Sequence, residues 1–254
     1  YESFNNIIFR KSKKMDIFKY SILSKKFSIR DKFIKFLIYT SGTTHKPKGV
    51  MISNRAITNN ISSIKENLKM KSSDKTIIFS PPAYAMGISQ ILTAMSCNSS
   101  IVFYNQGLKF PYDLLKLIKK YKISILNLSI SSFRILKNYL NKKEKLNCPR
   151  IVMSGGMQYS INDFNNFKMT FPKAKLINFY GCTENSPRIS HCILKKKYLY
   201  NGYFPVGTPI KNVKIKILKS KSKNTKYGKI FISGKSLMSG YFNHQNLNKI
   251  KFKK

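Results

Sequence analysis

Apolar residues along the chain gather in short runs and in longer stretches with helical spacing. The short runs predict β-strands over residues 33–39, 76–80, 100–104, 123–128, 150–153 and 175–179. The longer stretches predict helices over residues 53–70, 87–96, 111–121, 131–140 and 160–171. Ser53 and Ser160 suit helix N-caps, and Pro111 suits a first helical turn. Strands and helices that alternate in this way predict an α/β fold, with parallel sheet layers and flanking helices.

The pattern changes after about residue 200. Lysines alternate with apolar residues over 213–218, a polar loop follows, and residues 228–233 form a second apolar run. Two such runs joined by a polar loop predict a β-hairpin. We therefore expect two parts, residues 1–200 and residues 201–254, the second being the start of a smaller antiparallel β subdomain.

Composition indicates a protein with a real core. The chain has 254 residues, of which 42% are hydrophobic, enough to bury the core of one large domain or of one and a half. No apolar run is long enough to predict a transmembrane segment, and no signal peptide is visible. Four cysteines are scattered without metal-binding spacing, so the expected location is the reducing cytoplasm; they are Cys97, Cys148, Cys182 and Cys192.

The formal charge of +39 raises the alternative of a lysine-rich nucleic-acid-binding protein. Arginine is the residue that grips phosphate and guanine with two hydrogen bonds, yet few of the basic residues are arginine. The lysines are also spread along the whole chain. We therefore expect non-specific attraction to polyanions and no specific nucleic-acid partner.

The segment 39–50, YTSGTTHKPKGV, follows the first predicted strand and precedes the first predicted helix. Glycine allows close backbone approach, hydroxyls donate hydrogen bonds, and lysine supplies positive charge, so the segment is suited to bind phosphate oxygens. It does not fit the Walker pattern. A Ser/Thr-rich surface turn is the alternative. The candidate phosphate-binding residues are Thr40, Ser41, Gly42, Thr43, Thr44 and Lys48.

Three further segments follow predicted strands, where ligands of parallel sheets bind. Gly155 and Gly156 allow close approach to a flat ring, although an ordinary tight turn has the same residues. Segment 180–184, YGCTE, combines an aromatic ring, a hydroxyl and a carboxylate; a helix N-cap with a first-turn acid is the alternative. Segment 80–87, SPPAYAMG, suits the wall of an apolar pocket or a proline-rich loop.

All four segments, in this order, resemble the motifs of the adenylate-forming (AMP-binding) superfamily, which includes acyl-CoA synthetases, acyl-carrier-protein ligases and the adenylation domains of peptide synthetases. Residues 206–209 (VGTP) and 228–241 (GKIFISGKSLMSGY) resemble two later motifs of that family. The resemblance covers roughly residues 33–245. His45 and Lys229 depart from it, since the family has glycine and glutamate at these positions.

The resemblance implies a role for each motif. Residues 40–44 and Lys48 would bind ATP, with Gly155 and Gly156 on the adenine side. Tyr180 would stack on adenine beside Gly181, Thr183 would contact the α-phosphate, and Glu184 would hold Mg²⁺. Lys48, Thr183 and Glu184 would be the catalytic residues. The residues expected to bind the acid are Tyr84, Gly87, Gly155 and Gly181.

The implied activity is ATP-dependent conversion of a carboxylic acid into an acyl-adenylate, with transfer to the thiol of CoA or of a carrier-protein phosphopantetheine. Segment 80–87 lacks an acidic residue and carries two prolines, so a fatty or other apolar acid is expected. Residues 1–200 would be a nucleotide- and acyl-binding core, shortened at its N-terminus. The family's ribose-binding aspartate, hinge and C-terminal lid domain lie outside this sequence. We therefore expect little turnover by the chain alone, and a non-catalytic nucleotide-binding remnant is the alternative.

Overall fold

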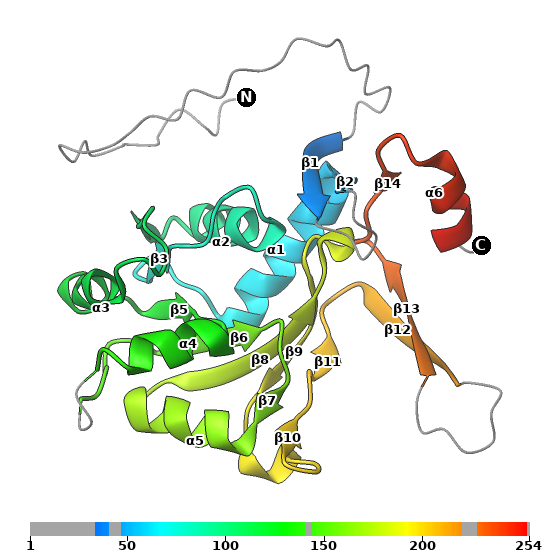
Figure 1. Cartoon of the computed structure of the whole chain (residues 1–254). Coiled ribbons are helices and arrows are strands. Elements are labelled where there is room, and N and C mark those ends of the chain that lie inside the picture. The colour runs from blue at the N-terminus through cyan, green and yellow to red at the C-terminus, as the bar shows by residue number, and fades with distance from the viewer. Residues whose placement is uncertain (1–33, 41–46, 141–143, 220–227, 253–254) are drawn as a thin grey trace. The chain divides into compact units, whose positions relative to one another are not determined.

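The computed structural model describes residues 34–40, 47–140, 144–219 and 228–252. Within these residues the largest sheet has seven strands (Figure 1). In spatial order they are β11 (Thr208–Pro209), β9 (Arg188–Ile193), β8 (Lys175–Gly181), β6 (Ile151–Gly155), β5 (Ile125–Asn127), β3 (Lys75–Ile78) and β4 (Ser100–Phe103). From β8 to β4 all neighbours are parallel, whereas β9 and β11 are antiparallel additions at one edge. The predicted parallel sheet is confirmed.

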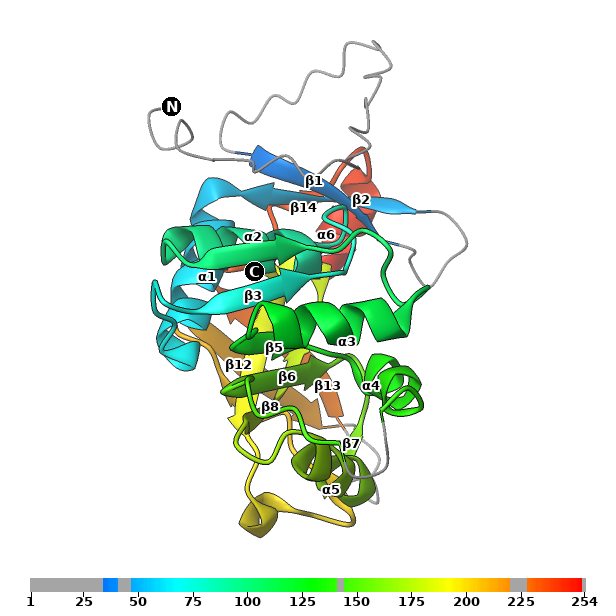
Figure 2. The ribbon, with the colours of Figure 1, turned by 90° about the vertical axis from the view of Figure 1, so that its left-hand side faces the viewer.

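Helices cover both faces of this sheet, as the alternating pattern predicts. They are α1 (Asn54–Leu68), α2 (Ala85–Ser96), α3 (Pro111–Lys120), α4 (Ile130–Lys137) and α5 (Ile161–Thr170). Helix α6 (Gln245–Lys251), near the end of the chain, instead contacts β14 (Gly240–Tyr241). Helices α3, α4 and α5 lie on one face, and α1 and α2 belong to the other (Figure 2).

The two faces follow from the alternation of side chains along each strand. On β6, Val152 packs in a core cluster with residues of α3, α4 and α5, whereas its neighbour Ile151 packs in another cluster with Ile64 and Leu68 of α1. Phe133, Phe167 and Phe171 fill the first cluster and are almost completely buried. Burying each such side chain contributes roughly 1.5–3 kcal/mol. The fold is therefore organised around one sheet with an apolar layer on each side.

The predicted helix starts are confirmed by the cap geometry. The Ser53 hydroxyl accepts a hydrogen bond from the Ala56 amide at 3.2 Å. Ser160 and Asp163 form a reciprocal capping box at the start of α5. Pro111 occupies the first turn of α3, where its missing N–H costs nothing.

One prediction is wrong. The first apolar run, β1 (Ile34–Thr40), does not join the parallel sheet but pairs antiparallel with β2 (Lys48–Ser53), a strand that the sequence pattern did not predict. A third strand, β14 (Gly240–Tyr241), completes this small sheet on the other side of β2. An apolar run predicts a strand but does not specify its partner, and here the partner is the next strand along the chain.

The remaining strands form short antiparallel pairs. The strands β12 (Val213–Lys219) and β13 (Gly228–Gly234) form the predicted hairpin, and β7 (Tyr159–Ser160) pairs with β10 (Tyr203–Phe204). Strands β10, β11 and β14 come after residue 200 but pair with strands that precede it. The division of the chain near residue 200 stays a prediction.

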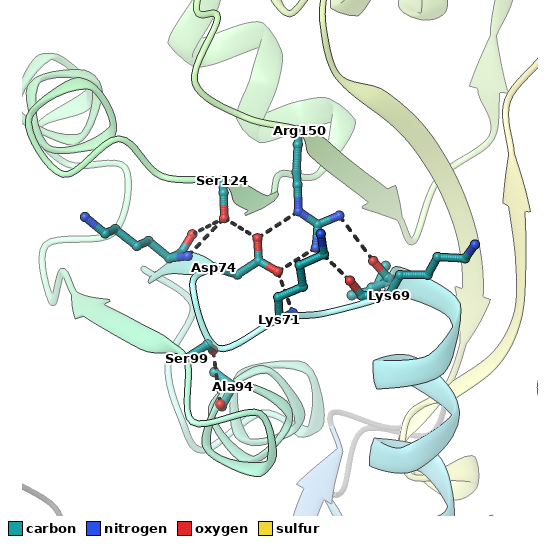
Figure 3. A network of polar contacts seen from close by, with 9 residues as sticks. Lys69, Lys71, Asp74, Ala94, Ser99, Ser124 and Arg150 are labelled. Carbon is teal, nitrogen blue, oxygen red and sulfur yellow. Dashed lines mark hydrogen bonds and ion pairs between the residues drawn. The ribbon is translucent and has the colours of Figure 1, made fainter.

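A polar network ties the amino ends of the parallel strands to the end of α1 (Figure 3). The Arg150 guanidinium binds both oxygens of Asp74, at 2.8 Å through Nε and 2.5 Å through Nη2, and also donates to the Lys69 carbonyl. Ser124 and the Lys71 amide donate to the same carboxylate. Burial opposes ionisation of Asp74, but these hydrogen bonds outweigh it and hold its pKa below the ordinary value. The opposite, carboxyl ends of the strands carry the candidate site.

Candidate functional site

The hairpin β1–β2 positions the predicted phosphate-binding segment. Thr40 is the last residue of β1 and pairs with Lys48, the first residue of β2, so these two residues lie opposite each other at the ends of the segment. The candidates at positions 41–44, namely Ser41, Gly42, Thr43 and Thr44, lie outside the described residues, as does His45. Lys48 was predicted as a loop residue, but a strand holds it in place.

Lys48 lies close to a buried tyrosine, and this tyrosine binds the predicted magnesium ligand. Its Nζ is 6.0 Å from the centre of the Tyr241 ring. The Tyr241 hydroxyl donates a hydrogen bond of 2.8 Å to Oε1 of Glu184. Burial, followed by this hydrogen bond, raises the pKa of Tyr241, so the hydroxyl stays protonated and keeps donating at neutral pH. A cation from β2, a phenol from β14 and a carboxylate from the turn after β8 are thus joined through Tyr241 and are here called the Lys48–Glu184 cluster.

Main-chain hydrogen bonds hold the segments of this cluster together. The Met238 amide donates to the Glu184 carbonyl at 2.8 Å, and the Ser239 amide donates to the Met51 carbonyl on β2 at 2.8 Å. Tyr241 pairs with Val50 in the ladder between β14 and β2. The late motif of residues 228–241 is therefore bound directly to the strand that carries Lys48.

Thr183 and Glu184 begin a 3₁₀ turn, Thr183–Asn185, which follows β8. A side-chain amide from α1 anchors the turn, since Asn60 donates to the Asn185 carbonyl at 2.8 Å. In the residue before the turn, burial, together with the nearby Glu184, raises the pKa of the Cys182 thiol to about 12. That thiol is therefore protonated at neutral pH and is no nucleophile. The functional groups that the turn presents are the Thr183 hydroxyl and the Glu184 carboxylate.

Gly155 and Gly181 end the neighbouring strands β6 and β8 and have no room for a side chain. A Cβ on Gly155 would lie 2.6 Å from the Phe179 ring, and one on Gly181 would lie 2.1 Å from the Pro187 carbonyl oxygen. Gly156 differs from both, because its φ of +84° is the reason for glycine and its Cβ would meet nothing within 4 Å. The open space beside Gly156 leaves one side of the strand end accessible to a flat ligand.

The residues predicted to contact adenine and the acid differ in how deeply they are buried. Tyr180 is half-buried against the apolar cluster at the edge of the sheet. Gly87 lies within the first turn of α2, where a Cβ would come within 2.4 Å of the Pro81 carbonyl oxygen. Tyr84 precedes α2 and is 60% exposed, so it lies at the surface of the described structure. Ala85, next to it, packs in the same apolar cluster as Tyr241, which joins the start of α2 to the Lys48–Glu184 cluster.

The residues present fit magnesium bound together with a nucleotide. Among the described residues no three His, Cys, Asp or Glu side chains gather into a metal site, so a cage made by the protein alone is absent there. Mg²⁺ in nucleotide enzymes is commonly held by one or two carboxylates plus the phosphates of the substrate. Glu184, half-buried and oriented by Tyr241, supplies one such carboxylate.

Three residues near the predicted site were not predicted as functional. Tyr241 orients Glu184, Phe179 packs against Gly155, and Arg188, the first residue of β9, is buried behind the 3₁₀ turn. For Arg188 a signal existed in the sequence, because arginine is rare among the basic residues of this chain and this one follows Glu184 closely. Its burial was visible only in the structure.

The arrangement of these motifs agrees with the comparison to known families. A model of the AMP-binding enzyme family matches residues 21–242. The chain belongs to this family. The match extends over most of the sequence and includes every motif that carries the resemblance.

Individual relatives span two kinds of protein. Bacitracin synthase 3 of Bacillus licheniformis is 27% identical over 225 residues, which cover 85% of this chain and 4% of that protein. The 4-coumarate–CoA ligase of Vanilla planifolia is 28% identical over 223 residues, which cover 82% of this chain and 39% of that protein. The chain therefore spans less than half the length of these curated relatives.

Solved structures show the same fold. O-succinylbenzoate coenzyme A synthetase of Bacillus subtilis, in complex with ATP and magnesium ion, matches with a TM-score of 0.73 and 22% identity, over 85% of this chain and 44% of that one. McyG A-PCP complexed with phenylalanyl-adenylate matches with a TM-score of 0.75 and 22% identity, over 88% of this chain and 43% of that one. The predicted core of an adenylate-forming enzyme is confirmed as the fold. None of the helices in the described part of the chain is long and apolar enough to cross a membrane.

Proposed function

We propose that this chain forms the nucleotide- and acid-binding part of an enzyme that activates a carboxylic acid with ATP and passes the acyl group to a thiol. The Lys48–Glu184 cluster carries this proposal. It joins the strand after the phosphate-binding segment to the carboxylate that follows β8, through a tyrosine that contacts both. Membership of the AMP-binding family supports the reaction class.

The chemistry follows from the weakness of a carboxylate as an electrophile. One oxygen of the acid attacks the α-phosphorus of ATP, the bond to the β-phosphate oxygen breaks, and pyrophosphate leaves. A thiol then attacks the acyl carbon, and AMP leaves with the bonding electrons. Lys48 offsets negative charge on the phosphates, and the Thr183 hydroxyl donates to an α-phosphate oxygen. Magnesium, when bound, would neutralise phosphate charge beside Glu184.

The proposal also covers the identity of the thiol acceptor and the chemical class of the acid. The relative named as a CoA ligase supports coenzyme A as the acceptor. A carrier-protein thiol stays a prediction from the family resemblance. The fatty or apolar character of the acid stays a prediction from residues 80–87. Pro81, Pro82 and Tyr84 are exposed in the structure, so these side chains do not form a closed apolar pocket within the described residues.

Binding of Mg·ATP tests the proposal directly. We expect the 254-residue chain to bind Mg·ATP in isothermal titration calorimetry at about 0.15 M salt, where exposed charges are largely screened. Glu184→Gln should weaken binding severalfold, because a neutral amide cannot offset magnesium charge. Tyr241→Phe should weaken it less, because the carboxylate remains but loses its orienting hydrogen bond.

The matched control is Glu66→Gln. Glu66 is an exposed carboxylate on α1, with a side chain 52% exposed, that pairs with Lys211 at 3.3 Å. The variant makes the same change of charge at an exposed position outside the Lys48–Glu184 cluster, so binding should be unchanged. Equal affinities of the wild type, Glu184→Gln and Glu66→Gln would show that ATP is held only by the general positive charge, and would refute the proposal.

A further inference from the structure

A small cavity lies between helices α1 and α2 and the central sheet. Its volume is about 20 Å³. The polar or charged residues on its wall are Thr76, Ser89, Gln90, Thr93 and Arg188, and apolar residues such as Met153 complete it. The lining is thus mixed, and its polar side can form hydrogen bonds with an occupant.

Arg188 contributes a buried cation to this cavity. The residue is 5% exposed, and its guanidinium lies over the Phe179 ring at 4.0 Å. Its Nη1 and Nη2 atoms approach only the Met153 sulfur, at 3.9 and 3.8 Å, and Nε has no hydrogen-bond partner. Burial lowers the pKa of Arg188 to about 10, so the group remains charged at neutral pH. Among the described residues no carboxylate forms an ion pair with it.

This situation is unfavourable for a residue with only a structural role. Buried charges in proteins are paired or satisfied by hydrogen bonds, because the desolvation penalty is otherwise uncompensated. The Met153 thioether is a weak acceptor. The guanidinium also stacks on the Phe179 ring, but stacking provides no acceptor for its five N–H groups. The guanidinium therefore has donors available for an anionic partner.

The cavity adjoins the residues predicted to bind the acid. Arg188 is the ladder partner of Gly181 in the pairing of β8 with β9. Met153 lies two residues before Gly155 on β6. The cavity therefore begins beneath these strand ends, at Arg188 and Met153, and runs under the sheet toward its amino side, where Thr76 and Ile125 line it. Helix α2, which carries Gly87, supplies Ser89, Gln90 and Thr93 to the wall.

We propose that Arg188 binds a second anionic group on the acid substrate, so that the enzyme activates one carboxylate of a dicarboxylic acid while Arg188 holds the other. This inference rests on the proposed function, and it names the class of acid. It replaces a purely apolar acid with one that ends in a small anion.

The size and the donors of the cavity agree with this class. A space of roughly 10–15 Å³ is needed for one water molecule, so the cavity of about 20 Å³ has room for one small polar group, such as an oxygen of a carboxylate, and not for a fatty chain. The hydroxyls of Ser89 and Thr93 already donate to helix carbonyls, at 3.0 and 2.6 Å. The donors left to meet an anion are the Arg188 guanidinium, the Gln90 carboxamide and the Thr76 hydroxyl.

Binding of diacids and of their monomethyl esters to the 254-residue chain tests the proposal. Succinate, glutarate and adipate are compared with their monomethyl esters by calorimetry, at about 0.15 M salt and with Mg·ATP present. At least one diacid should bind about tenfold more tightly than its ester. Arg188→Met should reduce this preference to less than about twofold. The matched control, Arg55→Met, removes one positive charge from an exposed position on α1 and should keep the preference.

Two further measurements, the unfolding temperature of Arg188→Met and diacid binding by Gln90→Leu, show whether the variants fold and which residue carries the preference. Without any acid, Arg188→Met should unfold at a temperature at least as high as that of the wild type, since it removes an unpaired buried charge; this also shows that the variant folds. Gln90→Leu should weaken diacid binding without abolishing the preference. If diacid and ester bind alike, or if Arg188→Met keeps the preference, the inference is wrong.

The remaining outcomes distinguish an inorganic anion from a diacid as the partner of Arg188. They also distinguish failure of this inference from failure of the proposed function. Stabilisation of the wild type by chloride over isethionate, with no preference among the acids, would identify an inorganic anion and overturn the inference. Normal Mg·ATP binding without a diacid preference refutes the inference and leaves the proposed function intact. A diacid preference without specific Mg·ATP binding supports the Arg188 site but refutes the proposed function.

Discussion

The ion pair between Asp74 and Arg150 offers the sharpest prediction about stability. Replacing Asp74 with asparagine keeps the size of the side chain but removes the charge that receives two hydrogen bonds from Arg150, at 2.8 and 2.5 Å. The Asp74 side chain is 4% exposed, whereas that of Arg150 is 37% exposed. The variant therefore leaves a partly solvated arginine beside a neutral amide (Figure 3).

The magnitude follows from this difference in exposure. Breaking a fully buried ion pair costs about 3–5 kcal/mol, mostly because one charge stays buried without a partner. Arg150 recovers part of that cost from water and keeps its bond to the Lys69 carbonyl at 3.1 Å. The Ser124 hydroxyl can still donate to the amide oxygen of the variant. We therefore expect the free energy of unfolding to fall by about 2–3 kcal/mol.

The dependence on pH has a definite sign. The pKa of Asp74 is lower in the folded chain than in the unfolded one, so its ionisation stabilises the fold at every pH above the unfolded value of about 3.9. This contribution is lost as the pH falls through the folded pKa. The difference between wild type and Asp74→Asn should thus be constant from pH 5 to 8 and should shrink below about pH 4.

Urea unfolding followed by circular dichroism, at a series of pH values, measures this difference. Glu66→Gln is the control, because exposed pairs contribute only about 0–1 kcal/mol. A loss below about 0.5 kcal/mol for Asp74→Asn would contradict the reasoning, since that is the range of ordinary surface changes. A loss that stays constant down to pH 2 would also refute it.

Two further predictions concern the ends of the strands. Gly155→Ala should lower the free energy of unfolding by about 1–3 kcal/mol, because its Cβ would lie 2.6 Å from the Phe179 ring; thermal unfolding measures this, and unchanged stability would contradict the close packing. Cys182 should resist alkylation by iodoacetamide at pH 8 in the folded chain, because burial and Glu184 raise its pKa to about 12. Peptide mapping with and without urea measures it, and rapid labelling of Cys182 in the folded chain would overturn the assignment.

Much of the fold and of the reaction class could be predicted from the sequence alone. Apolar periodicity depends on which face of each element is buried, so it predicted the parallel strands, their covering helices and the late hairpin. Ser160 and Pro111 marked helix starts because capping depends on local chemistry. The phosphate-binding segment and the YGCTE segment are short and rich in functional groups, so their chemistry could be recognised without knowledge of their surroundings.

Tertiary structure decided what depends on contacts between distant residues. The pairing of β1 with β2, and not with the parallel sheet, depends on strand partners that an apolar run does not encode. The hydrogen bond from Tyr241 to Glu184 joins residues far apart in the chain. The burial of Arg188 is of the same kind: segment 80–87 favoured an apolar acid, but the pairing of β8 with β9 places a cation against the cavity. Local sequence determines which groups are present, whereas packing determines which of them meet and how strongly water is excluded from them.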